Sequence, residues 1–96
     1  MRLVLVEWED SHGNGEWQEI DGSIEDRALR CRSVGWLVLD GKRAKVIAPH
    51  MNEPEPGVEL QGCGIMTIPA AAIISITRLA VPTRAAKRRS RQRSNA

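Results

Sequence analysis

Short apolar stretches separated by polar turns follow one another along most of the chain. Five of them have strand length: residues 2–8 (RLVLVEW), 29–40 (LRCRSVGWLVLD), 42–48 (KRAKVIA), 64–69 (GIMTIP) and 74–79 (ISITRL). Runs rich in Val, Ile and Leu and bounded by Gly, Pro and Asp are typical of β-strands. The pattern therefore predicts five strands, the second of them bent near Gly35.

The segments between these runs carry different signals. In residues 21–30 (DGSIEDRALR), Ser23 can cap a helix and Asp26 stands at the capping-box position, so one or two helical turns are expected. Residues 70–74 (AAAII) predict a single tight helical turn before the last strand. The proline-containing residues 49–62 predict a long loop.

The dipeptide Asp40-Gly41 between two apolar runs is a strong hairpin signal. With this turn, side chains alternate between two faces of the hairpin. The expected core face holds Leu37, Leu39, Ala44, Val46 and Ala48. The opposite face holds Val34, Trp36, Val38, Arg43, Lys45 and Ile47. A four-residue turn keeps this assignment, whereas a β-bulge breaks it.

The outer face of this hairpin is the first candidate for binding. It places Trp36 within cross-strand reach of Arg43 and Lys45. An indole ring can stack on a base while the cations meet phosphate. The same residues also fit an ordinary cation–π pair, or a tryptophan buried in a subunit contact. Both interpretations stay open.

A second candidate is the polar loop between Trp8 and Trp17, which contains His12 and two glycines. Backbone N–H groups at the glycines can face an anion, and the two rings can close over a ligand. The alternative is that Trp8 belongs to the core and Trp17 plugs the loop. Arg32 and His50 complete the residues expected to bind a ligand.

Composition adds a charge asymmetry. Residues 1–82 hold twelve acids and eight Lys/Arg (8 − 12 = −4), whereas residues 83–96 hold six Lys/Arg and no acid (+6). We expect one β-domain over residues 1–80 and a disordered basic tail over 81–96. The tail's cations can neutralise nucleic-acid phosphates, or serve only solubility. They are Arg84, Lys87, Arg88, Arg89, Arg91 and Arg93.

Several classes of protein find little support. The two cysteines and two histidines are not at zinc-site spacings, so neither a metal nor another cofactor is expected. No nucleophile motif is present, which favours a non-enzymatic protein. No apolar run reaches the roughly 18 residues of a membrane span, and we expect a cytoplasmic chain with reduced thiols. A disulfide between Cys31 and Cys63 stays open as the alternative. With no Phe or Tyr the core is small, which favours a homo-oligomer.

Three segments carry a resemblance to a known group. The stretches SVGWLV, VIAPH and GIMTIPAAAIISITRL resemble small phage- and prophage-encoded proteins, over about residues 3–80. The stretch MTIPAAAIISITRL is similar to the end of Sm-like barrels, where a short turn precedes an edge strand that joins subunits. Together with the five strands, this predicts a mainly β fold: a small five-stranded SH3/Sm-like barrel with one helical turn.

The phage group has no established activity to transfer. By analogy with small viral counter-defence proteins, the resemblance implies an accessory protein in the cytoplasm of a bacterial host. The function hypothesis is a non-enzymatic protein that binds and sequesters a small signalling nucleotide. Two alternatives stay open: a nucleic-acid-binding barrel that uses the basic tail, and a protein–protein adaptor with tryptophan anchors.

Overall fold

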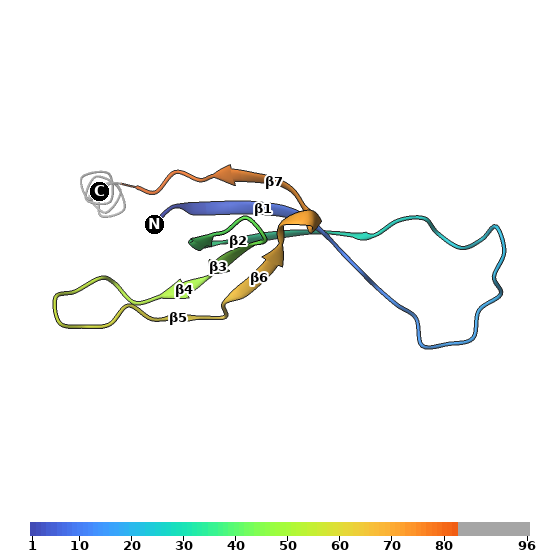
Figure 1. Ribbon diagram of the computed structural model, residues 1–96, viewed down its shortest axis with the longest axis horizontal. Coiled ribbons are helices and arrows are strands. Elements are labelled where there is room, and N and C mark those ends of the chain that lie inside the picture. The colour runs from blue at the N-terminus through green and yellow to red at the C-terminus, as the bar shows by residue number, and fades with distance from the viewer. Residues whose placement is uncertain (83–96) are drawn as a thin grey trace, which may run out of the picture.

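The computed structural model describes residues 1–82 and is built around a five-stranded antiparallel sheet (Figure 1). Its strands are β1 (Leu3–Asp10), β2 (Leu29–Asp40), β3 (Ala44–Ala48), β6 (Met66–Pro69) and β7 (Ile73–Arg78). Joining β6 to β7 is the short 3-10 turn η1 (Ala70–Ala72). The mainly β class, the five strands and the turn before the last strand are confirmed.

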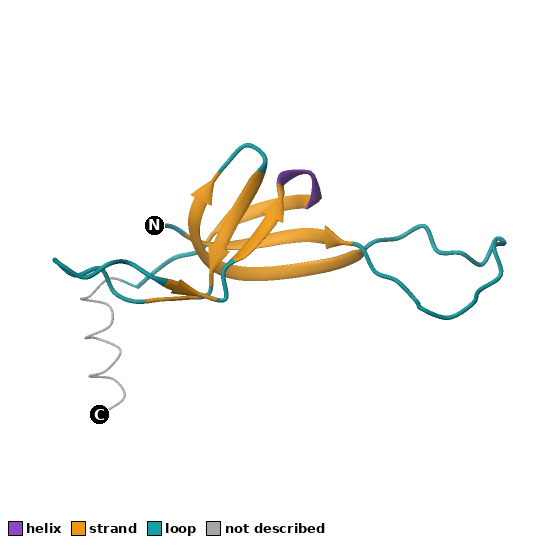
Figure 2. Ribbon diagram, turned by 60° about the horizontal axis from the view of Figure 1, so that its bottom comes forward, coloured by secondary structure: helices purple, strands orange, loops and turns teal. Residues whose placement is uncertain are grey.

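The strands lie in the order β6-β3-β2-β1-β7. The chain runs through β1, β2, β3 and β6 as a meander, and β7 then returns to the free side of β1. The sheet curls, as Figure 2 shows, but β6 and β7 remain its two edges. Within residues 1–82 no ladder joins these edges, so the predicted barrel is not closed.

The core lies on one side of the curled sheet, here called the inner face. Its buried side chains are Val4, Val6, Leu37, Ile47 and Ile68, with Trp8 and Ile73 packed against them. Alternation along β1 explains the start of this face, because every second residue from Val4 to Trp8 points inward. These five side chains form a small core for a chain of this length. Ala48, predicted in the core, is the sixth buried apolar residue among residues 1–82.

The predicted faces of the β2–β3 hairpin are wrong beyond Val38. Asp40 pairs with Lys45, which leaves a four-residue connection, and neither Asp40 nor Gly41 has a positive φ, so the expected primed turn is absent. A register shift between Leu37 and Leu39 then leaves Val38 as an extra residue. The bulge reverses the side-chain alternation of β2 relative to β3. Ile47 and Lys45 therefore lie on the inner face, together with Leu37. Leu39 is 57% exposed and Ile47 only 2%.

Gly35 lies on β2 beside the last residues of β3. A Cβ at this position would lie 3.0 Å from the carbonyl oxygen of Ala48 and 3.1 Å from Cβ of Ile47. We expect Gly35→Ala to lower the free energy of unfolding by about 1–3 kcal/mol through overpacking. Urea unfolding measures this, with Gly13→Ala as the control because its Cβ would meet nothing within 4 Å. Equal effects of the two changes would contradict the close packing at Gly35.

Two arms extend from opposite ends of the sheet (Figures 1 and 2). The first arm comprises residues 11–28, between β1 and β2, and the second comprises residues 49–64. They account for a radius of gyration of 19.2 Å, against about 12–13 Å for a compact domain of this length.

The helix predicted at the end of the first arm is absent. The carboxylate of Asp21 accepts hydrogen bonds from the backbone N–H of Ser23 (2.8 Å) and from its hydroxyl (2.6 Å). The N–H of Ile24 donates to the carbonyl of Asp21 at 3.2 Å, which closes one turn. Ser23 is thus engaged in a local turn that competes with helix capping.

The second arm, predicted as a loop, is a hairpin. Its strands are β4 (His50–Met51) and β5 (Gly62–Cys63). The side chain of Asn52 reinforces it, accepting a hydrogen bond from the N–H of Gln61 at 2.7 Å. At its tip the N–H of Val58 donates to the carbonyl of Glu55 (3.2 Å), and Gly57 has φ 78°. Pro followed by Gly suits a type II turn there.

Candidate functional site

A hollow of about 240 Å³ opens on the inner face, at the end of the sheet opposite the first arm, which joins the end of β1 to the start of β2. It is lined by Arg2, Val4, Leu37, Asp40, Lys45, Ile76 and Arg78. The strand register accounts for this gathering, because Val4 pairs with Arg78 across β1 and β7. Val4, Leu37 and Ile76 form an apolar floor. This set is called the inner-face hollow below.

The inner-face hollow carries three cations and one carboxylate. Asp40 forms ion pairs with Arg2, at 3.1 Å, and with Lys45. Lys45 is only 23% exposed and also donates to the carbonyl of Gly41 at 2.9 Å. Among residues 1–82, Arg78 has no carboxylate at ion-pair distance. The hollow therefore has a net charge of +2 (3 − 1) and one guanidinium available to an anion.

The hydrogen bond from Lys45 and its charge, helped by Arg2, hold the pKa of Asp40 below its usual value near 3.8. The charge of the Asp40 carboxylate therefore stabilises the fold fully at a pH above its usual pKa. This stabilisation is lost as the pH falls through the lowered pKa of the folded state. We expect Asp40→Asn to lower the free energy of unfolding at pH 7, and the difference from the parent to shrink below about pH 4. Urea unfolding between pH 7 and pH 2 measures this. A difference that is constant with pH would contradict the role of the carboxylate charge.

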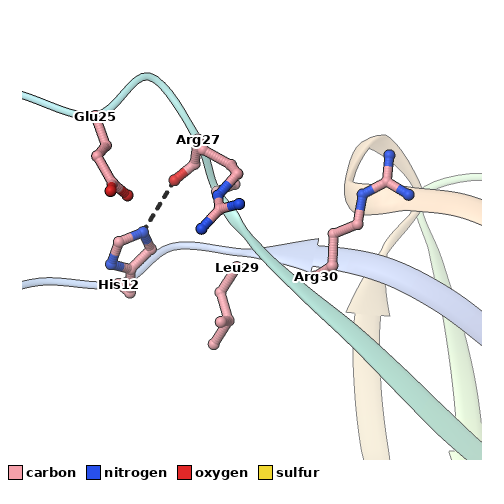
Figure 3. A pocket seen from close by; sticks show the side chains of 6 residues that line it. His12, Glu25, Arg27, Leu29 and Arg30 are labelled. Atoms are coloured by element: carbon pink, nitrogen blue, oxygen red, sulfur yellow. Dashed lines mark hydrogen bonds between the residues drawn. The ribbon is translucent and has the colours of Figure 1, made fainter.

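A larger hollow, of about 420 Å³, lies where the first arm joins the sheet. In Figure 3, His12 and Glu25 face each other and the guanidinium of Arg27 lies above Leu29, while Arg30 points away. Nε2 of His12 lies 2.9 Å from the carbonyl oxygen of Arg27, which ties the two sides of the arm together. Glu25 offsets one of the two arginines, so the net charge of this lining is +1 (2 − 1), lower than that of the inner-face hollow.

Trp36 is half-buried on the outer face, opposite Leu3 and Ala48. It is separated from Lys45 by the sheet, because the bulge at Val38 moves Lys45 to the inner face. The predicted trio of Trp36, Arg43 and Lys45 is therefore not brought together. Trp36 instead lines a hollow of about 350 Å³ with both polar and apolar walls. The residues around it are Met1, Arg2, Leu3, Arg78, Leu79, Ala80 and Val81.

The two other tryptophans take separate roles. Trp8 packs against the core, and its indole N–H donates to the hydroxyl of Ser33 at 3.0 Å. Trp17 is fully exposed in the first arm. They do not close over the loop between them, and the core alternative for Trp8 is the one that the structure supports.

The remaining predicted residues are dispersed. Arg43 is exposed in the β2–β3 turn, where its carbonyl accepts a hydrogen bond from the N–H of Ala70 at 2.8 Å. Arg32 is exposed and lies 3.8 Å from Glu7. His50 is exposed on β4. The cations Arg84, Lys87, Arg88, Arg89, Arg91 and Arg93 lie outside the described residues.

Both thiols are free: Cys31 is half-buried and Cys63 is exposed. Within residues 1–82, no three side chains of His, Cys, Asp or Glu cluster as a metal site would require. In the same part of the chain no helix has the length and apolar character needed to cross a membrane.

Of the predicted site residues, Lys45 alone lines the inner-face hollow; Arg2, Asp40 and Arg78 were missed. The alternation of side chains along the two strands could have placed both arginines on the inner face. Arg2 stands two positions before Val4, and Arg78 two positions after Ile76. Comparison with known proteins adds no relative, since no family model, curated protein or solved structure matches the chain.

Proposed function

We propose that this protein is a non-enzymatic binding protein that takes a small nucleotide-type ligand at the end of the sheet opposite the first arm. The inner-face hollow carries the proposal, because it holds three cations and one carboxylate beside apolar side chains, and Arg78 is not paired with that carboxylate. Its 240 Å³ is below the roughly 300–1,000 Å³ of pockets that enclose a drug-sized ligand. It suits a phosphate or phosphorylated sugar rather than a whole nucleotide.

The base would then use the neighbouring hollow at Trp36. Arg2 and Arg78 line both hollows, so a ligand that uses both faces must pass around the end of the sheet at these two arginines. A base stacked on an indole contributes about 1–3 kcal/mol. A hydrogen bond to a charged group contributes about 1.5–3 kcal/mol. One stacked base and two such hydrogen bonds sum to about 4–9 kcal/mol. A micromolar complex needs about 8 kcal/mol net, so further contacts of the ligand must offset the entropic cost of association.

The arrangement of the strands supports a more specific fold. The sheet order, the 3-10 turn after β6 and the return of β7 to β1 fit an opened SH3-like or Sm-like small barrel. The resemblance to phage-encoded proteins supports a biological role in which the ligand is a signalling nucleotide of host defence, held away from its receptor. That role belongs in the cytoplasm of a bacterial host.

The test is calorimetric titration of the full-length protein with ADP-ribose and AMP, with pyrophosphate as the control that lacks a base. In a separate experiment, protein purified from cells is denatured and the small molecules that it releases are identified by mass spectrometry. Saturable binding of a nucleotide at micromolar or lower concentration, tighter than pyrophosphate, supports the proposal. If neither nucleotide binds and none is released, the proposal is wrong.

The nucleic-acid alternative rests on the six cations of residues 83–96. Removal of residues 83–96 distinguishes this alternative from the preferred function. Loss of single-stranded RNA binding on removal of residues 83–96, with nucleotide binding absent from both forms, would favour the alternative. The salt dependence of that binding would give the number of phosphates neutralised.

A further inference from the structure

The first arm (residues 11–28) projects from the sheet and adds no side chain to the core (Figure 1). All its residues are exposed, including Trp17 and Ile20, whose side chains have almost no neighbours. Exposed tryptophans are unusual in a small soluble protein and are enriched among interface anchors. The arm is thus a surface that folding leaves without a partner.

The arm is also acidic. It holds five acids and one arginine, a net charge of −4. The acids are Glu16, Glu19, Asp21, Glu25 and Asp26. Pairing of two such arms side by side would bring like charges together, which is unfavourable. The partner of the arm must therefore be basic, and the exposed indole of Trp17 suits a guanidinium group, which stacks on aromatic rings.

The same chain supplies a segment of this chemistry. Residues 83–96 carry +6, and five of the six cations are arginines. This segment follows the part of the chain that leaves β7 at the end of the sheet opposite the arm, in a molecule 61 Å long. Fourteen residues span at most about 46–50 Å when fully extended. To reach Trp17 of its own chain the segment would have to run back along the length of the sheet, which carries an entropic cost.

We propose that residues 83–96 of one copy bind the first arm of a second copy, with arginine stacked on Trp17 and cations facing Glu16, Glu19 and Asp21. Because the two surfaces differ, the contact is heterologous, and repeated contacts build a ring or an open chain. The proposal does not depend on the nucleotide site, which lies at the other end of the sheet from the arm.

Two complementary variants test it. The first lacks residues 83–96 and keeps the arm. The second keeps residues 83–96 and carries E16Q, W17A, E19Q and D21N, exposed positions that add nothing to the core. A matched control neutralises three acids of the second arm instead, with E53Q, E55Q and E59Q. Circular dichroism checks that each variant folds, and nuclease treatment removes nucleic acid.

Sedimentation then gives the masses. The parent and the matched control are expected to be oligomeric, each complementary variant monomeric, and their equimolar mixture a heterodimer whose Kd rises at least tenfold between 50 and 500 mM salt. A monomeric parent, a truncated variant that keeps the parent's mass, or a mixture that stays monomeric would overturn the proposal. Equal weakening of the matched control would also overturn it, because the contact would then not be specific to the first arm.

Discussion

An alanine at position 47 is expected to lower the free energy of unfolding by about 2–5 kcal/mol, the range for truncating a buried isoleucine. Ile47 is 2% exposed and sits in the centre of the inner face, between Leu37 on β2 and Met66 on β6. Among residues 1–82 the core cluster has five large buried side chains, so a cavity there has few neighbours able to relax into it. Urea unfolding followed by circular dichroism measures the change.

The matched control is Leu39→Ala. Leu39 lies on the same hairpin but is 57% exposed, so we expect a loss below about 1 kcal/mol. Alternation without the bulge at Val38 would give the reverse order, with Leu39 in the core and Ile47 outside. If Ile47→Ala does not fold, Ile47→Val keeps the test, with an expected loss of about 0.5–1.5 kcal/mol. A larger effect at Leu39 than at Ile47 would contradict the register.

Removing the side chain of Arg78 is expected to weaken ADP-ribose binding by about 10- to 100-fold. This corresponds to the 1.5–3 kcal/mol of a hydrogen bond to a charged group. Arg78 ends the edge strand β7, is exposed, and has no carboxylate at ion-pair distance within residues 1–82, so Arg78→Ala should spare the fold. Calorimetry measures the affinity.

Arg43→Ala is the control for this change. Arg43 is a comparably exposed arginine in the β2–β3 turn, and it lines none of the hollows at the end of the sheet. Its removal is expected to alter the affinity less than twofold. Equal losses for the two variants would indicate attraction by overall charge instead of a site at Arg78.

Much of the secondary structure follows from local pattern. β2 begins and ends where the sequence predicts, because its flanks change from β-forming to polar residues on both sides. The β4–β5 hairpin was missed because its strands have two residues each, too short for a periodic signal. The helix after Ser23 was a reasonable prediction that failed because the Asp21 carboxylate engages Ser23 first.

The candidate site could not be predicted in the same way. One extra residue at Val38 exchanges the two faces of the hairpin, and nothing local in the sequence marks it. Arg2 and Arg78 meet only because β7 returns to β1, a pairing of residues more than seventy positions apart. The sequence shows that Arg2 shares a strand face with Val4, and Arg78 with Ile76. It does not show that both arginines lie at the same end of the sheet.

Amide chemical-shift mapping during titration with ADP-ribose tests the central claim most directly. The expected result is a single group of perturbed amides around the inner-face hollow and Trp36, including Val4, Leu37, Lys45 and Arg78. Residues 11–28 and the turn at Arg43 should be unchanged. Perturbations confined to the first arm or to the β2–β3 turn, or none at millimolar ligand, would contradict a nucleotide site at this end of the sheet.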